Sequence, residues 1–133
     1  MKKILPIIVA TLLLVGCAAP ADREVSYRQV TMDEAVVIME EKENYIILDV
    51  RTVAEFNEKH IPGAINVPNE AIGAETIPEL PDQDQLILVY CRSGNRSKQA
   101  AEKLVKLGYT NIVEFGGIID WTGETVKNEG GSQ

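Results

Sequence analysis

The sequence of 133 residues lacks an apolar run long enough to cross a bilayer. Its longest apolar stretch covers residues 4–15, whereas a spanning helix needs roughly 20 residues. Lys2 and Lys3 stand before this stretch, and a small residue, Gly16, stands after it. This arrangement is typical of a secretory signal. A permanent transmembrane anchor is therefore the weaker interpretation, and we expect the chain to be exported.

Cysteine is scarce, because the chain has only Cys17 and Cys91. Residues 14–17, Leu-Val-Gly-Cys, resemble the lipobox of bacterial lipoproteins, in which the cysteine is diacylated and becomes the new N-terminus. Two acyl chains hold a protein on a membrane stably. Cys17 is therefore predicted to anchor the chain to the outer face of the bacterial cell membrane, on the periplasmic or cell-surface side. The alternative is a signal cleaved elsewhere, with Cys17 an incidental small apolar residue.

An acylated Cys17 would leave Cys91 as the only free thiol, without a partner for a disulfide. Basic residues are also few, since removal of residues 1–16 leaves 117 residues with 11 basic and 20 acidic side chains, a net charge of −9. This balance argues against nucleic acid or an anionic lipid surface as a partner, so we expect membrane contact through the lipid anchor only. The length predicts one domain, and we expect a monomer.

The chain divides into four expected segments. Residues 1–16 are predicted to be the lipoprotein signal peptide, and residues 17–26 the lipidated cysteine with a tether of small and polar residues. The single domain is expected over residues 27–127, and residues 128–133 are expected to form a flexible tail.

Short apolar runs alternate with helical patterns along this domain. Four runs are predicted to be strands buried on both faces, at residues 45–50, 64–67, 86–90 and 111–115. A capping-box pattern, Thr31-Met-Asp-Glu34, begins a first helix. Further helices are predicted over residues 52–58, 69–76 and 97–107, followed by a short last helix with Trp121. The alternation predicts an α/β fold with a central, mostly parallel sheet and helices on both faces.

The stretch Cys-Arg-Ser-Gly-Asn-Arg-Ser, residues 91–97, follows the predicted strand at residues 86–90. Beyond the carboxyl end of a parallel strand, groups meet the free amides of the next helix. The Cys91 thiol would face these amides and the guanidinium groups of Arg92 and Arg96, which all favour thiolate over thiol. The residues therefore predict an activated nucleophile that needs no histidine or other base.

Gly94 and Asn95 are the loop residues that best tolerate a positive φ, so we expect them to turn the loop amides inward. The alternative for Cys91 is a buried, inert cysteine, and for the two arginines it is solvated surface charge. The glycine turn and the two arginines favour the reactive interpretation.

Four motifs, in order along residues 27–126, resemble the rhodanese domain family. They are Asp49-Val-Arg51; Glu55-Phe56 with His60-Ile-Pro-Gly-Ala-Ile-Asn-Val-Pro68; Val89 to Ser97; and Gly116-Gly117 with Trp121. One departure is Lys59, where the family often has glycine, and we expect it on the surface. The resemblance implies a small α/β module with sulfurtransferase activity, whose cysteine carries sulfane sulfur as a persulfide.

The resemblance also implies roles for the loop. Cys91 would be the catalytic nucleophile, and the residues that bind the substrate would be Arg92, Ser93, Gly94, Asn95, Arg96 and Ser97. The donor would be a small sulfur-containing anion such as thiosulfate, and the acceptor a thiol, a protein or another nucleophile. This chemistry needs no cofactor and no metal.

Asp49 and Arg51 follow the carboxyl end of a strand, so they are expected near the same rim as supporting residues. A structural ion pair is the favoured interpretation for them. His60 is predicted to tie a turn by hydrogen bonding, not to act as a base. Trp121 is predicted to lie in the core.

Two other functions remain open from the sequence. A Cys…Arg loop at a helix N-terminus also suits phosphate esters or arsenate, but related cysteine phosphatases have five residues between Cys and Arg, whereas Cys91 and Arg96 have four. A module that only binds a partner, or carries persulfide without turnover, is the other alternative.

Overall fold

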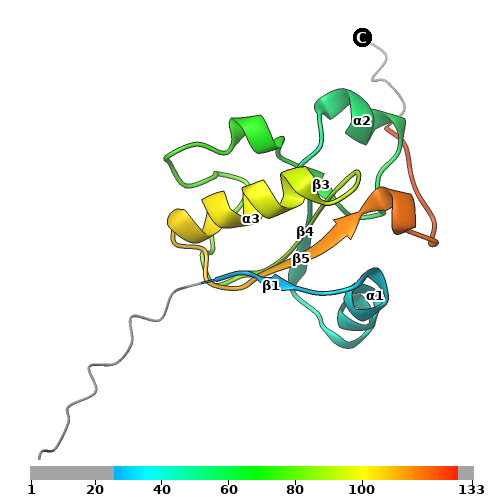
Figure 1. Cartoon of the computed structure of the whole chain (residues 1–133), viewed down its shortest axis with the longest axis horizontal. Helices are drawn as coiled ribbons and strands as arrows, with labels where there is room; N and C mark the ends of the chain where they lie inside the picture. Colours follow the sequence, from blue (N-terminus) through cyan, green and yellow to red (C-terminus); the bar gives the residue numbers. More distant parts are fainter. Residues whose placement is uncertain (1–25, 129–133) are drawn as a thin grey trace, which may run out of the picture.

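A computed structural model describes residues 26–128. Five strands within this range form one sheet in the order β1-β5-β4-β2-β3, and all paired strands are parallel (Figure 1). Their bounds are β1 Arg28–Gln29, β2 Tyr45–Asp49, β3 Ile65–Asn66, β4 Leu86–Cys91 and β5 Ile112–Gly117. The predicted α/β fold with a central parallel sheet is confirmed.

Helices cover both faces of the sheet (Figure 1). α1, Met32–Glu41, packs on one face, and α3, Asn95–Lys106, packs on the other. α2, Val53–Glu58, follows the carboxyl end of β2, and two single-turn 3₁₀ helices, η1 Asn69–Ala71 and η2 Ile118–Asp120, complete the elements. α2 is capped by a reciprocal pair, in which Thr52 Oγ1 accepts from Glu55 N–H while the Glu55 carboxylate accepts from Thr52 N–H.

Strand β4 divides the core into two layers, because successive side chains of a strand point to opposite faces. Ile87, Val89 and Cys91 join the cluster under α3, whereas Leu88 and Tyr90 join the cluster under α1. This explains why the strand reads as a continuous apolar run. It also places the Cys91 side chain on the α3 face of the sheet.

α3 begins two residues before the predicted start. Gly94 is its N-cap with φ 114°, and Asn95 is already helical. The expectation that Asn95 also takes a positive φ is therefore wrong, and Gly94 alone makes the turn. Ala100, Ala101 and Leu104 bury the predicted apolar face.

The predicted helix over residues 69–76 is wrong. Only Asn69–Ala71 forms a single 3₁₀ turn, and the chain beyond Gly73 is irregular. The segment lacks a helical apolar repeat. It forms an irregular loop instead, and apolar side chains of this loop, such as Ile72 and Ile77, are buried.

Strand β1 was not predicted, because its two exposed residues carry no pattern and are fixed only by pairing with β5.

The last helix is shorter than predicted, because η2 ends at Asp120 and Trp121 follows it. Trp121 is half-buried against the α1-side cluster, and its Nε1 donates to Glu124 O at 2.9 Å. The prediction that Trp121 lies in the core is therefore only partly confirmed.

Near the end of the described range, Asn128 N–H donates to Asn57 O at 3.2 Å. No helix within residues 26–128 has both the length and the apolar character to span a membrane.

Candidate active site

Cys91 is the last residue of β4, and the loop that follows it returns directly to its sulfur. Only three residues separate Cys91 from the start of α3. The Gly94 N–H donates to Cys91 Sγ at 2.9 Å, and the positive φ of Gly94 aims this amide inward. The Cys91 side chain thus lies at the N-terminal end of α3, where backbone amides and the helix dipole favour negative charge.

Cys91 is deeply set, with 1% of its surface exposed. Its Sγ lies 3.4 Å from Ser97 Oγ, in the first turns of α3. Of the predicted substrate-binding residues, Gly94 and Ser97 are therefore the two whose atoms contact the sulfur. The loop positions Arg92, Ser93 and Asn95 are exposed, where their side chains can meet a molecule from solvent.

The Arg96 guanidinium is paired with a carboxylate in this structure. Its Nη1 and Nη2 bind the Glu55 carboxylate of α2 at 2.7 and 3.0 Å. Hydrogen bonding to Arg96 lowers the pKa of Glu55 from its usual value to about 2, and the same pair raises the pKa of Arg96. The bidentate pair ties the loop to α2. A role of Arg96 in binding a donor stays a prediction.

Glu114 is a site residue that the sequence analysis missed. It lies on β5 with 3% of its surface exposed. Its Oε1 accepts from Ser97 Oγ at 2.6 Å and from Gly116 N–H at 2.9 Å. The available signal was a charged residue inside Ile-Val-Glu-Phe, a strand that otherwise reads as fully buried.

Gly117 allows the end of β5 to touch the loop backbone. A Cβ at Gly117 would lie 1.9 Å from Arg92 O and 2.5 Å from Ser93 N. Gly117 also pairs with Cys91 across a register shift between β4 and β5. Gly117 is thus needed for close approach to the loop, which fixes the position of the backbone after Cys91.

Asp49 and Arg51 form the predicted ion pair, and both are buried. Arg51 Nη2 binds Asp49 Oδ2 at 2.6 Å and also donates to Lys59 O at 2.6 Å. Burial alone would lower the pKa of Arg51, but the Asp49 carboxylate outweighs it and raises that pKa. Because the pair fastens the turn before His60, these residues support the fold next to the loop.

His60 has the tying role predicted for it. Its Nδ1 lies 2.8 Å from Phe56 O, and its ring stacks on the Phe56 ring with centroids 3.7 Å apart. Its backbone bridges to Val126. These contacts fix the end of α2 and place the histidine in the fold of this turn, away from the hydrogen bonds made by Cys91 Sγ.

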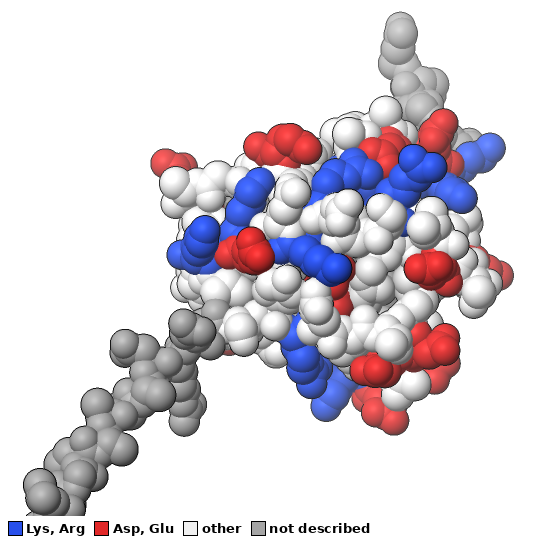
Figure 2. Space-filling model, in the orientation of Figure 1, with Lys and Arg blue, Asp and Glu red and all other residues white. Residues whose placement is uncertain are grey.

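The loop and α3 form a basic face on an acidic protein. Residues 92–106 hold five basic side chains and one acidic side chain, whereas the rest of the described chain holds five basic and 16 acidic ones. Figure 2 shows lysine and arginine gathered across the face formed by α3, with acidic side chains over α1. The field near the Cys91 loop therefore attracts anions.

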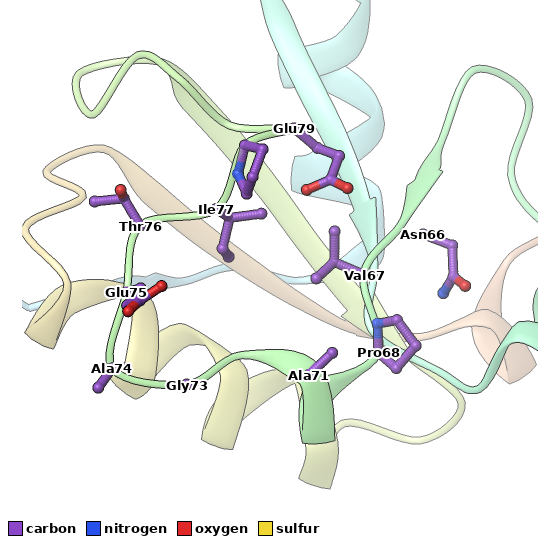
Figure 3. Close-up of a pocket in the computed structure, with 11 residues that line it drawn as sticks. Asn66, Val67, Pro68, Ala71, Gly73, Ala74, Glu75, Thr76, Ile77 and Glu79 are labelled. Atoms are coloured by element: carbon purple, nitrogen blue, oxygen red, sulfur yellow. The ribbon is translucent and has the colours of Figure 1, made fainter.

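A hollow beside the β3 edge is not part of this site. It has a volume of about 610 Å³ and lies between residues 66–68 and the loop at residues 71–79 (Figure 3). No residue of the 91–97 loop lines it. Within residues 26–128, no cluster of three His, Cys, Asp or Glu side chains offers a metal site.

Comparison with known proteins agrees with this geometry. The sequence profile of the rhodanese-like domain matches residues 31–124. The chain belongs to the rhodanese-like domain family. The matched residues include the β4 cysteine, the loop, α3 and Glu114.

Several relatives of the rhodanese-like chain are named sulfurtransferases. The thiosulfate sulfurtransferase PspE of Escherichia coli is 35% identical over 80 residues, which cover 60% of this chain and 77% of PspE. A sulfurtransferase of Allochromatium vinosum is 39% identical, covering 59% of this chain and 73% of that protein. The solution structure of the rhodanese-like domain of Alr3790 from Anabaena superposes with a TM-score of 0.66 at 25% identity, covering 78% and 83% of the two chains. Family and relatives assign the chain to the rhodanese-type sulfurtransferases.

Proposed function

We propose that this chain moves sulfane sulfur from a thiosulfate-like anion, through a persulfide on Cys91, to a thiol or another nucleophilic acceptor. The observation that carries the proposal is the position of Cys91 Sγ, which accepts the Gly94 N–H at 2.9 Å at the start of α3. A sulfur anion at that place is stabilised by a fixed donor and by the helix terminus.

In the loading step the Cys91 thiolate attacks the outer sulfur of the donor. The new S–S bond forms as the bond between that sulfur and the sulfonate group breaks, and sulfite leaves with the electron pair. The product is an anionic Cys91 persulfide. The persulfide and the thiolate are both anions, so the Gly94 N–H that stabilises the thiolate also stabilises the persulfide.

In the unloading step a nucleophilic acceptor attacks the terminal sulfur of the persulfide. The S–S bond breaks and Cys91 leaves with the electron pair of that bond, so that it can be loaded again. Both steps are displacements at sulfur, in which the donor supplies the sulfur and the acceptor removes it. No redox group is required to balance them.

The basic face supports an anionic donor. Arg92 is exposed and next to the nucleophile, and the lysines of α3 extend the positive surface. We expect Arg92→Ala to raise the KM for thiosulfate with little change in kcat, because a charge at the mouth of the site binds ground and transition states alike. Arg28→Ala, at an exposed position on the edge strand β1, is the matched control.

The decisive test is incubation with thiosulfate followed by intact-mass measurement. The wild-type chain should gain the mass of one sulfur atom, and Cys91→Ser should gain nothing. Cys17→Ser, the same chemical change at the other cysteine, should load normally. An adduct that persists in Cys91→Ser would overturn the assignment of Cys91.

Addition of a thiol acceptor or cyanide then separates an enzyme from a carrier. Repeated release of transferred sulfur from excess thiosulfate is the outcome expected for an enzyme. Loading that stops at one sulfur per chain would mean that the chain carries persulfide for a partner not present in the assay.

We also propose, from the sequence at residues 14–17, that Cys17 is acylated and holds the domain on the outer face of the cell membrane. Cys17 lies outside the described residues. Cys17→Ser should release the chain from the membrane fraction without changing its transfer rate. Membrane attachment of that variant after carbonate washing would mean that the apolar stretch at residues 4–15 is itself the anchor.

A further inference from the structure

Glu114 differs from every other carboxylate in residues 26–128. Only Asp49 and Glu114 are buried, and Asp49 is neutralised by Arg51. Within the described range, no Lys, Arg or His forms an ion pair with Glu114. A buried carboxylate without a cation is costly for stability, so its place beside the nucleophile requires an explanation other than folding.

The Glu114 carboxylate is connected to the nucleophile through one hydroxyl. Ser97 Oγ lies 2.6 Å from Glu114 Oε1 and 3.4 Å from Cys91 Sγ. The nearest other acceptor for the Ser97 hydroxyl is Gly94 O at 2.9 Å. Since a hydroxyl has one hydrogen, the shortest contact directs it to Glu114 and leaves the Ser97 oxygen free to accept from the Cys91 thiol. The hydrogen bonds then run in one direction, from thiol to hydroxyl to carboxylate.

We propose that Glu114 is a positioning residue that takes the Cys91 proton through Ser97 and returns it during sulfur transfer. The inference rests on the proposed sulfurtransferase function and deepens it. It also revises the expectation that the nucleophile is activated without any base. The sulfur contacts no histidine in the structure, and this carboxylate fills the place that a base occupies in other activated nucleophiles.

The proton that leaves Cys91 is accounted for by Ser97 and Glu114 alone. The thiol proton moves to Ser97 Oγ while the Ser97 hydroxyl proton moves to Glu114 Oε1. The result is a Cys91 thiolate, an unchanged Ser97 and a neutral Glu114. The thiolate then attacks the donor, and the neutral acid next to it adds no repulsion to the incoming anion.

The same path runs backward when the persulfide is discharged. The acceptor takes the terminal sulfur, and Cys91 departs with the electron pair of the broken S–S bond. Glu114 gives its proton to Ser97 Oγ as Ser97 gives its own to Cys91 Sγ. The leaving group is thereby protonated and the three residues return to their starting state.

Ionisable groups face Glu114 from β4 and from the chain just before β1. Cys91 faces it from β4 through Ser97. The Tyr27 hydroxyl, just before β1, interacts with Glu114 and with Glu102 of α3, and burial followed by these two carboxylates raises the pKa of Tyr27. α1 packs on the opposite face of the sheet. Titration of Tyr27 or Glu102 could also change the pH dependence of loading, so the test has to distinguish these two groups from the relay.

The test is the rate of sulfur loading of the full chain by thiosulfate, measured across pH for the wild type and Glu114→Gln. The amide keeps the size and the acceptor oxygen for Ser97 and Gly116 but cannot take a proton. We expect loading to fall about 10²-fold near neutral pH, the lower end of general acid–base contributions. The defect should shrink as pH rises, because hydroxide then removes the thiol proton directly.

Glu102→Gln is the matched control, since it removes the same charge from an exposed position near Tyr27. Its loading rate and pH profile should equal those of the wild type. Tyr27→Phe tests the remaining group in the same way. A Glu114→Gln variant that loads at the wild-type rate with the wild-type profile would overturn the proposal. A wild-type chain that never gains sulfur would instead overturn the function on which the proposal rests.

A double-mutant cycle separates a proton path from simple packing. Ser97→Ala breaks the path by itself, so Glu114→Gln should add no further loss to it. Independent, multiplying losses would show that Glu114 does not act through Ser97. If Glu114→Gln fails to fold, loading of the wild type in D2O gives the answer, because two protons move together in the relay. A loading rate that depends linearly on the deuterium fraction would mean that a single proton moves, and this would contradict the relay.

Discussion

Asp49, at the carboxyl end of β2, and Glu114, within β5, are both buried carboxylates of one sheet, yet they are held in opposite ways. Asp49 accepts from the Arg51 guanidinium and from the Arg51 backbone N–H. Glu114 accepts only from the neutral Ser97 hydroxyl and Gly116 amide among the described residues. The first arrangement stabilises the fold, and the second leaves a carboxylate able to exchange a proton with its neighbours.

The largest loss of stability is expected for Asp49→Asn. The change leaves Arg51 charged and buried without its partner, which costs about 3–5 kcal/mol of unfolding free energy. Urea denaturation would measure it, with Asp120→Asn at the exposed end of η2 as the control. A loss no larger than that of the control would mean that the ion pair does not distinguish the two carboxylates.

Gly117→Ala is expected to cost about 1–3 kcal/mol, because the new methyl group overlaps the loop backbone and one chain has to move. The displacement should also slow sulfur loading, since the same backbone leads to Gly94 and the sulfur. Gly73→Ala is the control, because its Cβ would meet nothing within 4 Å. Equal stability and loading of the two variants would show that the close approach at Gly117 is not required.

Glu55 is an intermediate case, a carboxylate that is partly exposed and paired with Arg96. Its pKa is lowered to about 2, so its contribution to stability is complete above the ordinary value of 4.5 and is lost as pH falls toward 2. Solvent screening limits it to about 1 kcal/mol. Glu55→Gln should therefore lower the unfolding free energy at neutral pH and flatten its decline in that acidic window, as measured by urea titrations at several pH values. A decline as steep as that of the wild type would assign the acid sensitivity to other groups.

The smallest change in stability is expected for Glu114→Gln. The amide keeps the hydrogen bonds from Ser97 and Gly116 and removes an unpaired buried charge, so the unfolding free energy should stay within about 1 kcal/mol or rise. Sulfur loading should nevertheless fall. Parallel denaturation and loading measurements on Asp49→Asn and Glu114→Gln thus test the comparison directly. A large loss of stability in Glu114→Gln would make the two carboxylates alike.

Several features of the site were predictable because they depend on residues close together in the chain. The strand before Cys91, the turn at Gly94 and the helix after it follow from one continuous stretch, residues 86–107. The ion pair of Asp49 and Arg51 joins residues two positions apart. The irregular chain after Ala71 was mistaken for a helix, because weak local preference does not show what a buried loop packs against.

The sequence by itself determined the alternation of strands and helices from β2 through α2 and from β4 through β5, the place of Cys91 at the end of β4, and the glycine that permits the sharp turn after it. These follow from side-chain alternation, helical periodicity and backbone sterics, which act within a few residues. Tertiary structure decided that Arg96 binds Glu55, 41 residues away, and that Ser97 reaches Glu114, 17 residues away. Such partners are set by which strand ends meet in the parallel sheet and in what register, and that choice depends on packing over the whole domain.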